Sequence, residues 1–509
     1  DADTDSDTDT DSDTDTDSDT DTDADSDTDA DSDTDTDADG DGDPGTSTDP
    51  DEIREDFSTI GTIILGRPTD SAVTASLIPA RNLVVFLEWG TASGIYTGKT
   101  EATEYPADEP VDFVIDGLSS NTRYYYRIQY RTPGETDFSA GLEHTFHTQR
   151  SAGSTFAFTV QADSHFGFDN HCNNDLYTMT FQHALAAYPD FHVDLGDTFM
   201  SNKLLDKPDE PFDEQTVIER HAMHRPFFGL LGHSAPLFLV IGNHEAELGY
   251  YLDGTADSLP VWASNARTRY YPNPTPDGFY TGDIMEEQFV GLRENYYAWQ
   301  WGDALFVVLD TYWYLPIDPK ETDDHWSWTL GEEQFMWFKE TIEGSGAKFK
   351  FVFAHHVMGE GRGAIEWATA FEWGGWSRNG KVWEFADRRP GWGDRAIHQL
   401  MADYGPTIFF QGHDHIFVKQ ELDGVVYQEV PMPADPTYSS CLEEGDCYGN
   451  GNDDIGYETG DVLPAAGHLR VTVSSSKVTV DYVRSFLPED EDQDQVNGEI
   501  AYSYTVNAK

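Results

Sequence analysis

The sequence Phe156-Ala-Phe-Thr-Val-Gln-Ala-Asp-Ser-His165 gives the first indication of the fold that we expect for this chain. Residues 156–161 form an apolar run that is short enough for a buried β-strand. Asp163 and His165 stand two residues apart just past this run, so both side chains can point into one cleft. A carboxylate and an imidazole placed in this way suit a metal ion with mixed oxygen and nitrogen ligands.

Four further polar segments follow in a fixed order, and each comes after an apolar run that predicts a strand. They are Gly196-Asp197, Gly242-Asn243-His244-Glu245, His355-His356 and Gly412-His413-Asp414-His415. In α/β domains, ligand-binding side chains gather at the carboxyl edge of the sheet, where all five segments would lie. Because each oxygen of a bridging carboxylate can take one cation, the set suits two metal ions that share Asp197, a layout that hydrolyses phosphate esters.

Strands and helices are expected to alternate over residues 151–509. We expect strands at 156–161, 191–195, 237–241, 349–354 and 407–410, helices at 175–187, 213–231, 331–342 and 394–404, and hairpins at 296–310 and 467–482. The economical arrangement is two sheets face to face with helices outside. The expected fold is therefore α/β (α+β), a four-layer α-β-β-α sandwich.

Residues 56–150 show short expected strands separated by turn signals such as Arg67-Pro-Thr-Asp70. This spacing predicts an all-β sandwich. The sequence Leu118-Ser-Ser-Asn-Thr-Arg-Tyr124 resembles the Leu-x-Pro-x-Thr-x-Tyr signature of fibronectin type III domains, with Ser120 in the proline position. The tyrosine of that signature closes a corner by hydrogen bonding to the backbone. We expect a structural role for this domain.

Residues 1–55 are expected to be a low-complexity tail and linker, in which every odd position from 1 to 43 is Asp. Residues 1–43 contain no apolar residue larger than Ala, so burial cannot offset the entropy cost of ordering them. One interpretation is a solvated spacer that holds the folded part away from a cell surface. The alternative is Ca²⁺ binding, because alternation places all carboxylates on one face of an extended strand. The Thr and Ser face could also carry O-linked sugar.

The formal net charge is −65, which argues against partners that are nucleic acids or anionic membranes, because both require a basic face. No stretch of 18 apolar residues is present, so no transmembrane segment is expected. The sequence starts at Asp1 without an apolar signal segment and is expected to be processed or truncated. Cys441 and Cys447 are expected to form a small disulfide loop, consistent with export, with free thiols as the alternative.

The five segments resemble the motifs of the calcineurin-like metallophosphoesterase superfamily, which are Asp-x-His, Gly-Asp, Gly-Asn-His-Asp/Glu, a lone His and Gly-His-x-His. With the preceding sandwich, the layout is similar to that of the purple acid phosphatases. The resemblance implies one metal ion on Asp163, His165, Asp197 and His415, and another on Asp197, Asn243, His355 and His413. It also implies that a hydroxide between the ions attacks phosphorus while His244 stabilises or protonates the leaving oxygen. Mixed ligation suits Mn, Fe, Zn or Co.

Three positions refine this resemblance. His355 is favoured over His356 because Val352-Phe-Ala-His355 has the spacing of the superfamily. The purple acid phosphatases have Gly where this chain has His165, and a tyrosine ligand where this chain has Met200. We therefore expect His165 to replace the tyrosine, which favours the broader phosphoesterase group.

Arg267, Arg269 and Arg362 lie in long segments that look like walls of an active site. Guanidinium groups bind phosphate oxygens well, so these three arginines are expected to contact the substrate. The alternative is that each arginine pairs with a neighbouring acid.

The leading hypothesis is a secreted or surface-tethered dinuclear phosphoesterase that acts on small phosphorylated monoesters, diesters or both. The alternative is a structural component of a calcium-dependent extracellular assembly, with the phosphatase domain as a module. In that case residues 1–43 would mediate self-association or attachment to a cell surface. Either hypothesis places the protein outside the cell, at the cell surface or in the periplasm.

Overall fold

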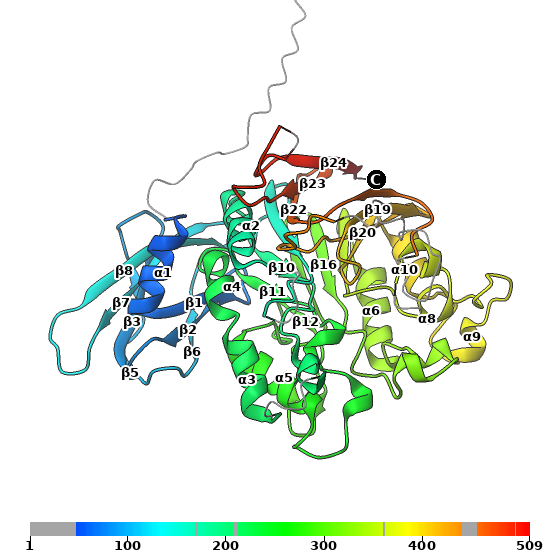
Figure 1. Cartoon of the computed structure of the whole chain (residues 1–509), viewed down its shortest axis with the longest axis horizontal. Helices are drawn as coiled ribbons and strands as arrows, with labels where there is room; N and C mark the ends of the chain where they lie inside the picture. The colour runs from blue at the N-terminus through cyan, green and yellow to red at the C-terminus, as the bar shows by residue number, and fades with distance from the viewer. Residues whose placement is uncertain are drawn as a thin grey trace, which may run out of the picture. The chain divides into compact units, whose positions relative to one another are not determined.

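The computed structural model describes residues 47–167, 172–206, 212–359, 362–439, 456–493 and 495–508. The Asp-rich repeat and the expected Cys441–Cys447 disulfide lie outside these ranges. Over the described residues the chain is a mixed α/β structure with several sheets, as the alternation of strands and helices predicts (Figure 1). In these ranges we find no helix that is both long and apolar enough to cross a bilayer.

The first sheet has nine strands among the described residues, in the order β24-β23-β22-β9-β10-β11-β1-β2-β6. Its centre is parallel and consists of β9 (Phe156–Gln161), β10 (His192–Asp194) and β11 (Leu237–Leu239). The antiparallel strands β22 (Gly467–Val473), β23 (Lys477–Arg484) and β24 (Ile500–Asn507) extend it beyond β9. The segments that carry Asp163, Asp197 and Asn243 follow β9, β10 and β11, so they meet at one edge of the sheet.

The second sheet has eight strands in the described part of the chain, in the order β12-β15-β16-β17-β18-β20-β19-β21. They are β12 (Thr281–Gly282), β15 (Tyr297–Trp301), β16 (Ala304–Val308), β17 (Phe349–Phe353), β18 (Thr407–Gln411), β19 (Phe417–Leu422), β20 (Val425–Glu429) and β21 (Asp461–Leu463). Because β17 and β18 are parallel, the loops that carry His355 and His413 leave the sheet at the same edge.

The two sheets pack against each other through an aromatic core. Phe158 of β9 contacts Phe306 of β16 and Phe351 of β17 edge to face, with ring centroids 5.2 Å apart in both pairs. Burial of such a side chain contributes about 1.5–3 kcal/mol. Helices α6 (Glu332–Gly344) and α10 (Ile397–Tyr404) pack on the other face of the second sheet. Helices α2 (Asn174–Ala186) and α4 (Arg225–Gly232) pack on the other face of the first sheet.

The strands of residues 61–147 surround a core of their own. Strands β1 (Gly61–Gly66), β2 (Val73–Pro79) and β6 (Val111–Ile115) face β3 (Leu83–Gly90), β4 (Gly98–Lys99), β5 (Thr103–Tyr105), β7 (Arg123–Arg131) and β8 (Ser139–His147). The Tyr124 hydroxyl accepts a hydrogen bond from the backbone N–H of Ser119 at 2.8 Å. Strand β1 also pairs in parallel with β11, at Gly66 and Leu237, so the nine-stranded sheet continues into this region.

Some elements differ from the sequence expectation. Helix α1 (Pro50–Thr59) lies partly where a linker is expected, because an Asp49 cap starts it and it buries Ile53 and Phe57. The single helix expected at 213–231 is divided into α3 (Glu214–Ala222) and α4. Pro226 explains this division, since it lacks the N–H that a continuous helix would need.

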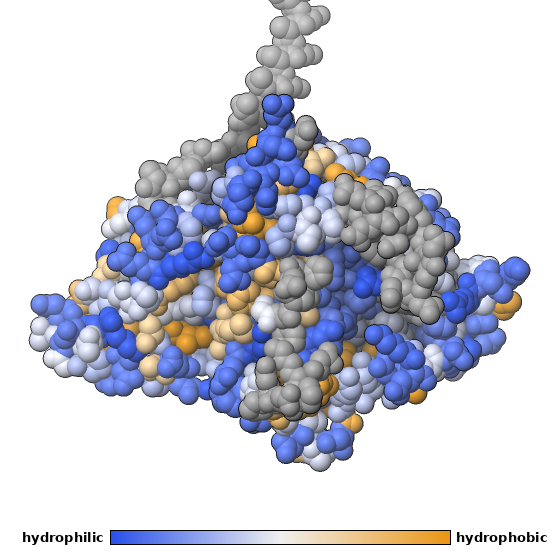
Figure 2. Space-filling model, viewed as in Figure 1, coloured by the Kyte–Doolittle hydropathy of each residue, from blue (hydrophilic) through white to orange (hydrophobic). Residues whose placement is uncertain are grey.

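The remaining described elements are mostly short. They are α5 (Leu259–Tyr270), α7 (Ile365–Ala368), α8 (Phe371–Gly374), α9 (Phe385–Arg388), β13 (Glu286–Glu287), β14 (Gly291–Leu292) and five 3-10 helices: η1 (Ser201–Asp206), η2 (Asn243–Glu245), η3 (Gly249–Tyr251), η4 (Pro319–Glu321) and η5 (His325–Ser327). The surface in Figure 2 is mostly hydrophilic, in keeping with the acidic composition.

Candidate metal centre

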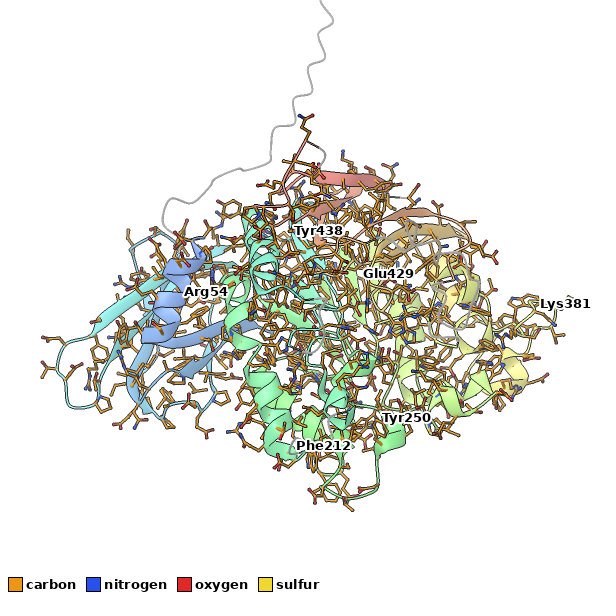
Figure 3. The ribbon with its side chains drawn as sticks, in the orientation of Figure 1. Arg54, Phe212, Tyr250, Lys381, Glu429 and Tyr438 are labelled. Atoms are coloured by element: carbon orange, nitrogen blue, oxygen red, sulfur yellow. The ribbon has the colours of Figure 1, made fainter. Side chains whose placement is uncertain are left out.

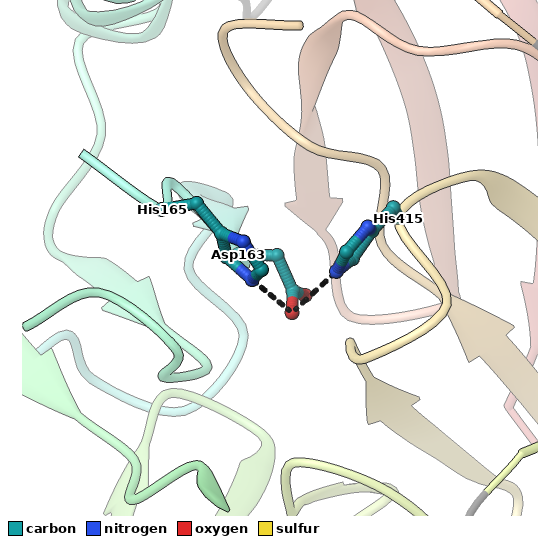
Figure 4. Close-up of side chains that lie close together, drawn as sticks. All are labelled: Asp163, His165 and His415. Atoms are coloured by element: carbon teal, nitrogen blue, oxygen red, sulfur yellow. Dashed lines mark ion pairs between the residues drawn. The ribbon is translucent and has the colours of Figure 1, made fainter. Parts of the chain in front are cut away.

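The segment after β9 places Asp163 between two histidines, as Figure 4 shows. Asp163 Oδ1 lies 3.9 Å from His165 Nε2 and 3.6 Å from His415 Nε2, which is too far for hydrogen bonds. The ligand atoms of this group all lie within 4.8 Å of one another. Asp163 is fully buried, and its Oδ1 has no hydrogen-bond partner among the described protein groups. A buried carboxylate oxygen without a donor fits a bound cation.

A second group forms around Asp197 with His355 and His413, and ligand atoms of Asp197, His165 and His244 also lie within 4.8 Å of one another. His355 Nε2 lies 3.0 Å from Asp197 Oδ2, and His413 Nδ1 lies 4.0 Å from the same oxygen. The two groups are adjacent, because His355 Nε2 is also 3.9 Å from Asp163 Oδ1. His355 Nδ1 lies 2.9 Å from the carbonyl oxygen of Leu195, which can only accept a hydrogen bond. Nδ1 therefore carries the proton, and Nε2 faces the carboxylates as a ligand atom would.

Burial and mutual charge shift the pKa values in this cluster. Burial raises the pKa of Asp163 to about 7, while His355 opposes the rise and Asp197 adds to it. Burial would also raise the pKa of Asp197, but His355 and His244 hold it well below its usual value. Burial lowers the pKa of His355, but Asp197 and Asp163 outweigh it and raise that pKa to about 10. Two buried carboxylates thus require nearby positive charge, which a metal cation can supply.

Helix η2 brings Asn243 and His244 beside Asp197. The backbone N–H of His244 donates to Asp197 Oδ1 at 2.6 Å, and His244 Nε2 lies 3.9 Å from Asp197 Oδ2. Asn243 Oδ1 is buried and accepts no hydrogen bond from the described protein groups, which fits a metal ligand. His244 Nδ1 lies 2.9 Å from Asn202 Oδ1, so Nδ1 carries the proton and Nε2 faces the cluster. Asn202 belongs to no motif, so the sequence does not reveal it.

Glu245 ties two of these loops together. Its buried carboxylate accepts backbone N–H groups from Asp197 at 2.8 Å, Thr198 at 2.7 Å, Phe199 at 3.1 Å and Gly242 at 2.6 Å. Charge-assisted bonds of this kind are roughly twice as strong as neutral ones. The sequence includes Glu245 in a motif but gives no sign of this role.

The loops of the cluster adopt backbone conformations that L residues rarely adopt. The angle φ is 58° at Asp163, 48° at His165, 54° at Asp197, 80° at His413 and 69° at His415. Each left-handed residue costs about 1–2 kcal/mol. Such conformations persist where the surrounding contacts determine them, and they concentrate at functional sites.

The contacts that hold the last loop are backbone hydrogen bonds to buried acids. The N–H of His413 donates to Asp163 Oδ2 at 2.8 Å, and the N–H of Asp414 donates to Glu429 Oε1 at 2.9 Å. Glu429, labelled in Figure 3, lies at the end of β20. A Cβ at position 412 would collide with the Asp163 carboxylate, which explains the glycine of this loop.

The structure distinguishes between the two adjacent histidines. His355 lies in the group with Asp197, whereas His356 lies outside the clusters. The His356 ring packs on His413 with centroids 4.7 Å apart, and its Nδ1 lies 2.7 Å from the carbonyl oxygen of Val357. Met200, in the place of the tyrosine ligand, is fully buried.

Only one of the three expected substrate-binding arginines lies at this site. Arg362 lines a cavity of about 760 Å³ that is also lined by Asn243, His244 and His413, and its Nη1 donates to Asp414 Oδ1 at 2.9 Å. Arg267 is fully buried and binds both carboxylate oxygens of Glu247. Arg269 pairs at the surface with Glu109. All three arginines therefore pair with a neighbouring acid, as the alternative has it, but only Arg362 also lines the cavity.

Comparison with known proteins shows what this chain resembles. Neither a protein-family model nor a curated protein matches the sequence. Among solved structures, the fold is similar to that of PhoD, with a TM-score of 0.58 and 15% identity over 88% of this chain and 90% of that chain. It is also similar to purple acid phosphatase PPD1 from yellow lupin (Lupinus luteus) seeds, with a TM-score of 0.56 and 15% identity over 87% and 74% of the two chains. The resemblance expected from the five motifs is therefore confirmed as a shared fold.

Proposed function

We propose that this protein is a metal-dependent phosphoesterase that hydrolyses phosphate monoesters, diesters or both. The observation that carries this proposal is the adjacency of two ligand groups, one around Asp163 and one around Asp197, each with its ligand atoms within 4.8 Å. The shared fold supports it, because the lupin protein with this fold is a phosphatase. The same proposal includes a four-layer α-β-β-α domain after a fibronectin type III-like sandwich, in a secreted or surface-attached protein.

Two transition metal ions are proposed as cofactors. Asp163, His165, Asp197 and His415 would hold one, and Asp197, Asn243, His355 and His413 would hold the other. This oxygen and nitrogen set suits Mn, Fe, Zn or Co. When bound, two such ions polarise a phosphoryl oxygen and lower the pKa of a bound water.

The protein's own residues would position the phosphate and move a proton. His244 is oriented by Asn202 through Nδ1, so its Nε2 is the nitrogen that would meet the leaving oxygen. Arg362 lines the cavity beside the cluster, where its guanidinium group would bind phosphate oxygens.

The test is hydrolysis of p-nitrophenyl phosphate and bis-p-nitrophenyl phosphate by the full chain, with and without a chelator. We expect turnover that the chelator abolishes, that one of Mn, Zn, Fe or Co restores, and that Asn243→Ala reduces strongly. The exposed residue Asn379 provides the matched control Asn379→Ala, which should retain wild-type turnover. Absence of turnover with all four metals would reject the proposal.

A further inference from the structure

We propose that the cavity beside the metal centre binds a planar aromatic group of the substrate, so that the substrate is an aryl or nucleoside phosphate ester. This inference rests on the proposed phosphoesterase function. The cavity of about 760 Å³ lies within the range of about 300–1,000 Å³ that is usual for sites enclosing small organic ligands. Asn243, His244 and His413 line it, and the lining extends to residues of η3, η4 and η5. It therefore has room for much more than a phosphate group.

The cavity lining includes the aromatic side chains of Tyr250, Tyr251, Tyr312 and Trp328, of which Tyr312 and Trp328 are buried. The rings of Tyr250 and Tyr251 pack edge to face with centroids 4.7 Å apart, and Tyr251 is 38% exposed. Trp328 is held in place, because its Nε1 donates to the Thr311 carbonyl oxygen at 2.9 Å. Aromatic faces of this kind stack on planar ligand groups.

The charges of the lining favour an anionic ligand. Its basic residues are Lys203, Lys320 and Arg362, which pairs with Asp414 outside the lining, and its acidic residue is Asp318. The whole chain has 30 Lys and Arg against 95 Asp and Glu, so the lining reverses the balance of the protein. A local excess of basic side chains raises the concentration of anions in a cleft. Aromatic walls and basic groups in one cavity match a phosphate ester whose organic part is flat.

Two phosphonates that differ only in their organic group would show how much an aromatic ring contributes to binding. Calorimetry would compare phenylphosphonate with methylphosphonate, neither of which the enzyme can hydrolyse as an ester, on the metal-loaded full chain. We expect phenylphosphonate to bind about tenfold more tightly, as stacking on one aromatic residue would give. In the Tyr250→Ala/Tyr251→Ala double variant, that ratio should fall below about twofold.

Tyr188 provides the matched control. It is half-exposed and outside the cavity lining, so Tyr188→Ala should keep the wild-type ratio. Circular dichroism checks that the double variant is folded. Equal affinities of wild type for the two phosphonates, or an unchanged ratio in the folded double variant, would overturn the inference.

Turnover separates failure of this inference from failure of the proposed function. We expect the double variant to lose more kcat/KM with phenyl phosphate than with glycerol 2-phosphate, each compared with wild type, so that the intrinsic reactivity of the ester cancels. If no ester is hydrolysed while the tenfold phosphonate ratio persists, the phosphoesterase function fails and the aromatic subsite stands. If chelator-sensitive turnover is present but the phosphonates bind equally, the subsite alone fails.

Discussion

Glu245 accepts a hydrogen bond from the backbone N–H of Asp197 at 2.8 Å, so one loop of the metal centre holds the backbone of the central aspartate in another. The same Glu245 oxygen accepts the N–H of Gly242 at 2.6 Å. A single buried carboxylate thereby sets the distance between the loop after β10 and the loop after β11. The metal ligands of these two loops depend on a residue that is not itself in either ligand group.

Substitution of Glu245 should both destabilise the protein and abolish metal binding. Glu245→Ala leaves four buried backbone donors without their acceptor, and each such donor costs about 1–3 kcal/mol. We expect the free energy of unfolding to fall by at least about 3 kcal/mol and the bound metal to be lost. Urea denaturation and elemental analysis measure these effects, with the exposed Glu101→Gln as control. Wild-type metal content in Glu245→Ala would contradict the assigned role.

The adjacent residues His355 and His356 allow a matched pair of substitutions that tests the metal site. His355→Ala removes a nitrogen that lies 3.0 Å from Asp197 Oδ2, so we expect it to bind about one metal ion fewer per chain. His356→Ala alters the cavity wall and should leave the metal content unchanged. Elemental analysis of the two purified variants shows which histidine is the metal ligand. Loss of metal in His356→Ala alone would make His356 the ligand in place of His355.

The buried pairing of Glu247 should contribute far more stability than a surface pair of the same kind. Glu247 binds Arg267 and also Arg293, the latter at 2.9 Å, and all three side chains are buried. Removing one partner of a buried pair costs about 3–5 kcal/mol. We expect Glu247→Gln to reduce the free energy of unfolding by about this amount. Glu109→Gln, which removes the partner of Arg269, should cost less than about 1 kcal/mol.

The ion pairs of Glu247 also predict how the stability of the protein depends on pH. Burial would raise the pKa of Glu247, but Arg267 and Arg293 outweigh it and lower that pKa to about 2. A depressed folded-state pKa stabilises the protein above the unfolded pKa of about 4.5, and this stability is lost as the pH falls towards 2. The difference in melting temperature between wild type and Glu247→Gln should therefore shrink below pH 4.5. A difference in melting temperature that stays the same below pH 4.5 would contradict the predicted direction.

Two stacked histidines should make the protein sensitive to milder acid. His144 of β8 lies on His233, at the end of α4, with ring centroids 4.3 Å apart. Burial lowers the pKa of His144 to about 3, and burial together with His144 lowers that of His233. The unfolded chain binds these protons first, so stability falls below about pH 6.5 by about 1.4 kcal/mol per pH unit for each histidine. Denaturant unfolding between pH 7 and pH 5 should show a shallower slope in His144→Phe, and an equal slope would refute the prediction.

Arg362 and Arg269 test which arginine meets the substrate. Arg362→Ala should raise KM for p-nitrophenyl phosphate about tenfold, because a hydrogen bond to a charged group contributes about 1.5–3 kcal/mol. Arg269→Ala should leave KM unchanged, since Arg269 pairs with Glu109 outside the cavity. Steady-state kinetics on both variants measure this, and equal KM values would remove Arg362 from the proposed site.

The sequence predicts the centre of the fold well because its signals there are local. The strands that precede Asp163 and His355 are mostly apolar, and each of these two residues follows its strand by two positions, so both the strand and its functional end are visible in the sequence. The contact between Asn202 and His244 is not visible, because it joins two loops 42 positions apart without any periodic pattern. Arg267 shows the converse: the sequence predicts a long loop there and so suggests a substrate ligand, whereas the folded chain places Arg267 in α5 against Glu247.

The parallel pairing of β1 with β11 bears on how the protein can be divided. The boundary expected at residue 150 separates two sequence patterns, yet the sheet crosses it at Gly66 and Leu237. A fragment that begins at residue 151 would leave the backbone of β11 as an open edge, which readily pairs with a strand of another molecule. Heating the intact protein should melt both regions in one cooperative transition, whereas the fragment should aggregate.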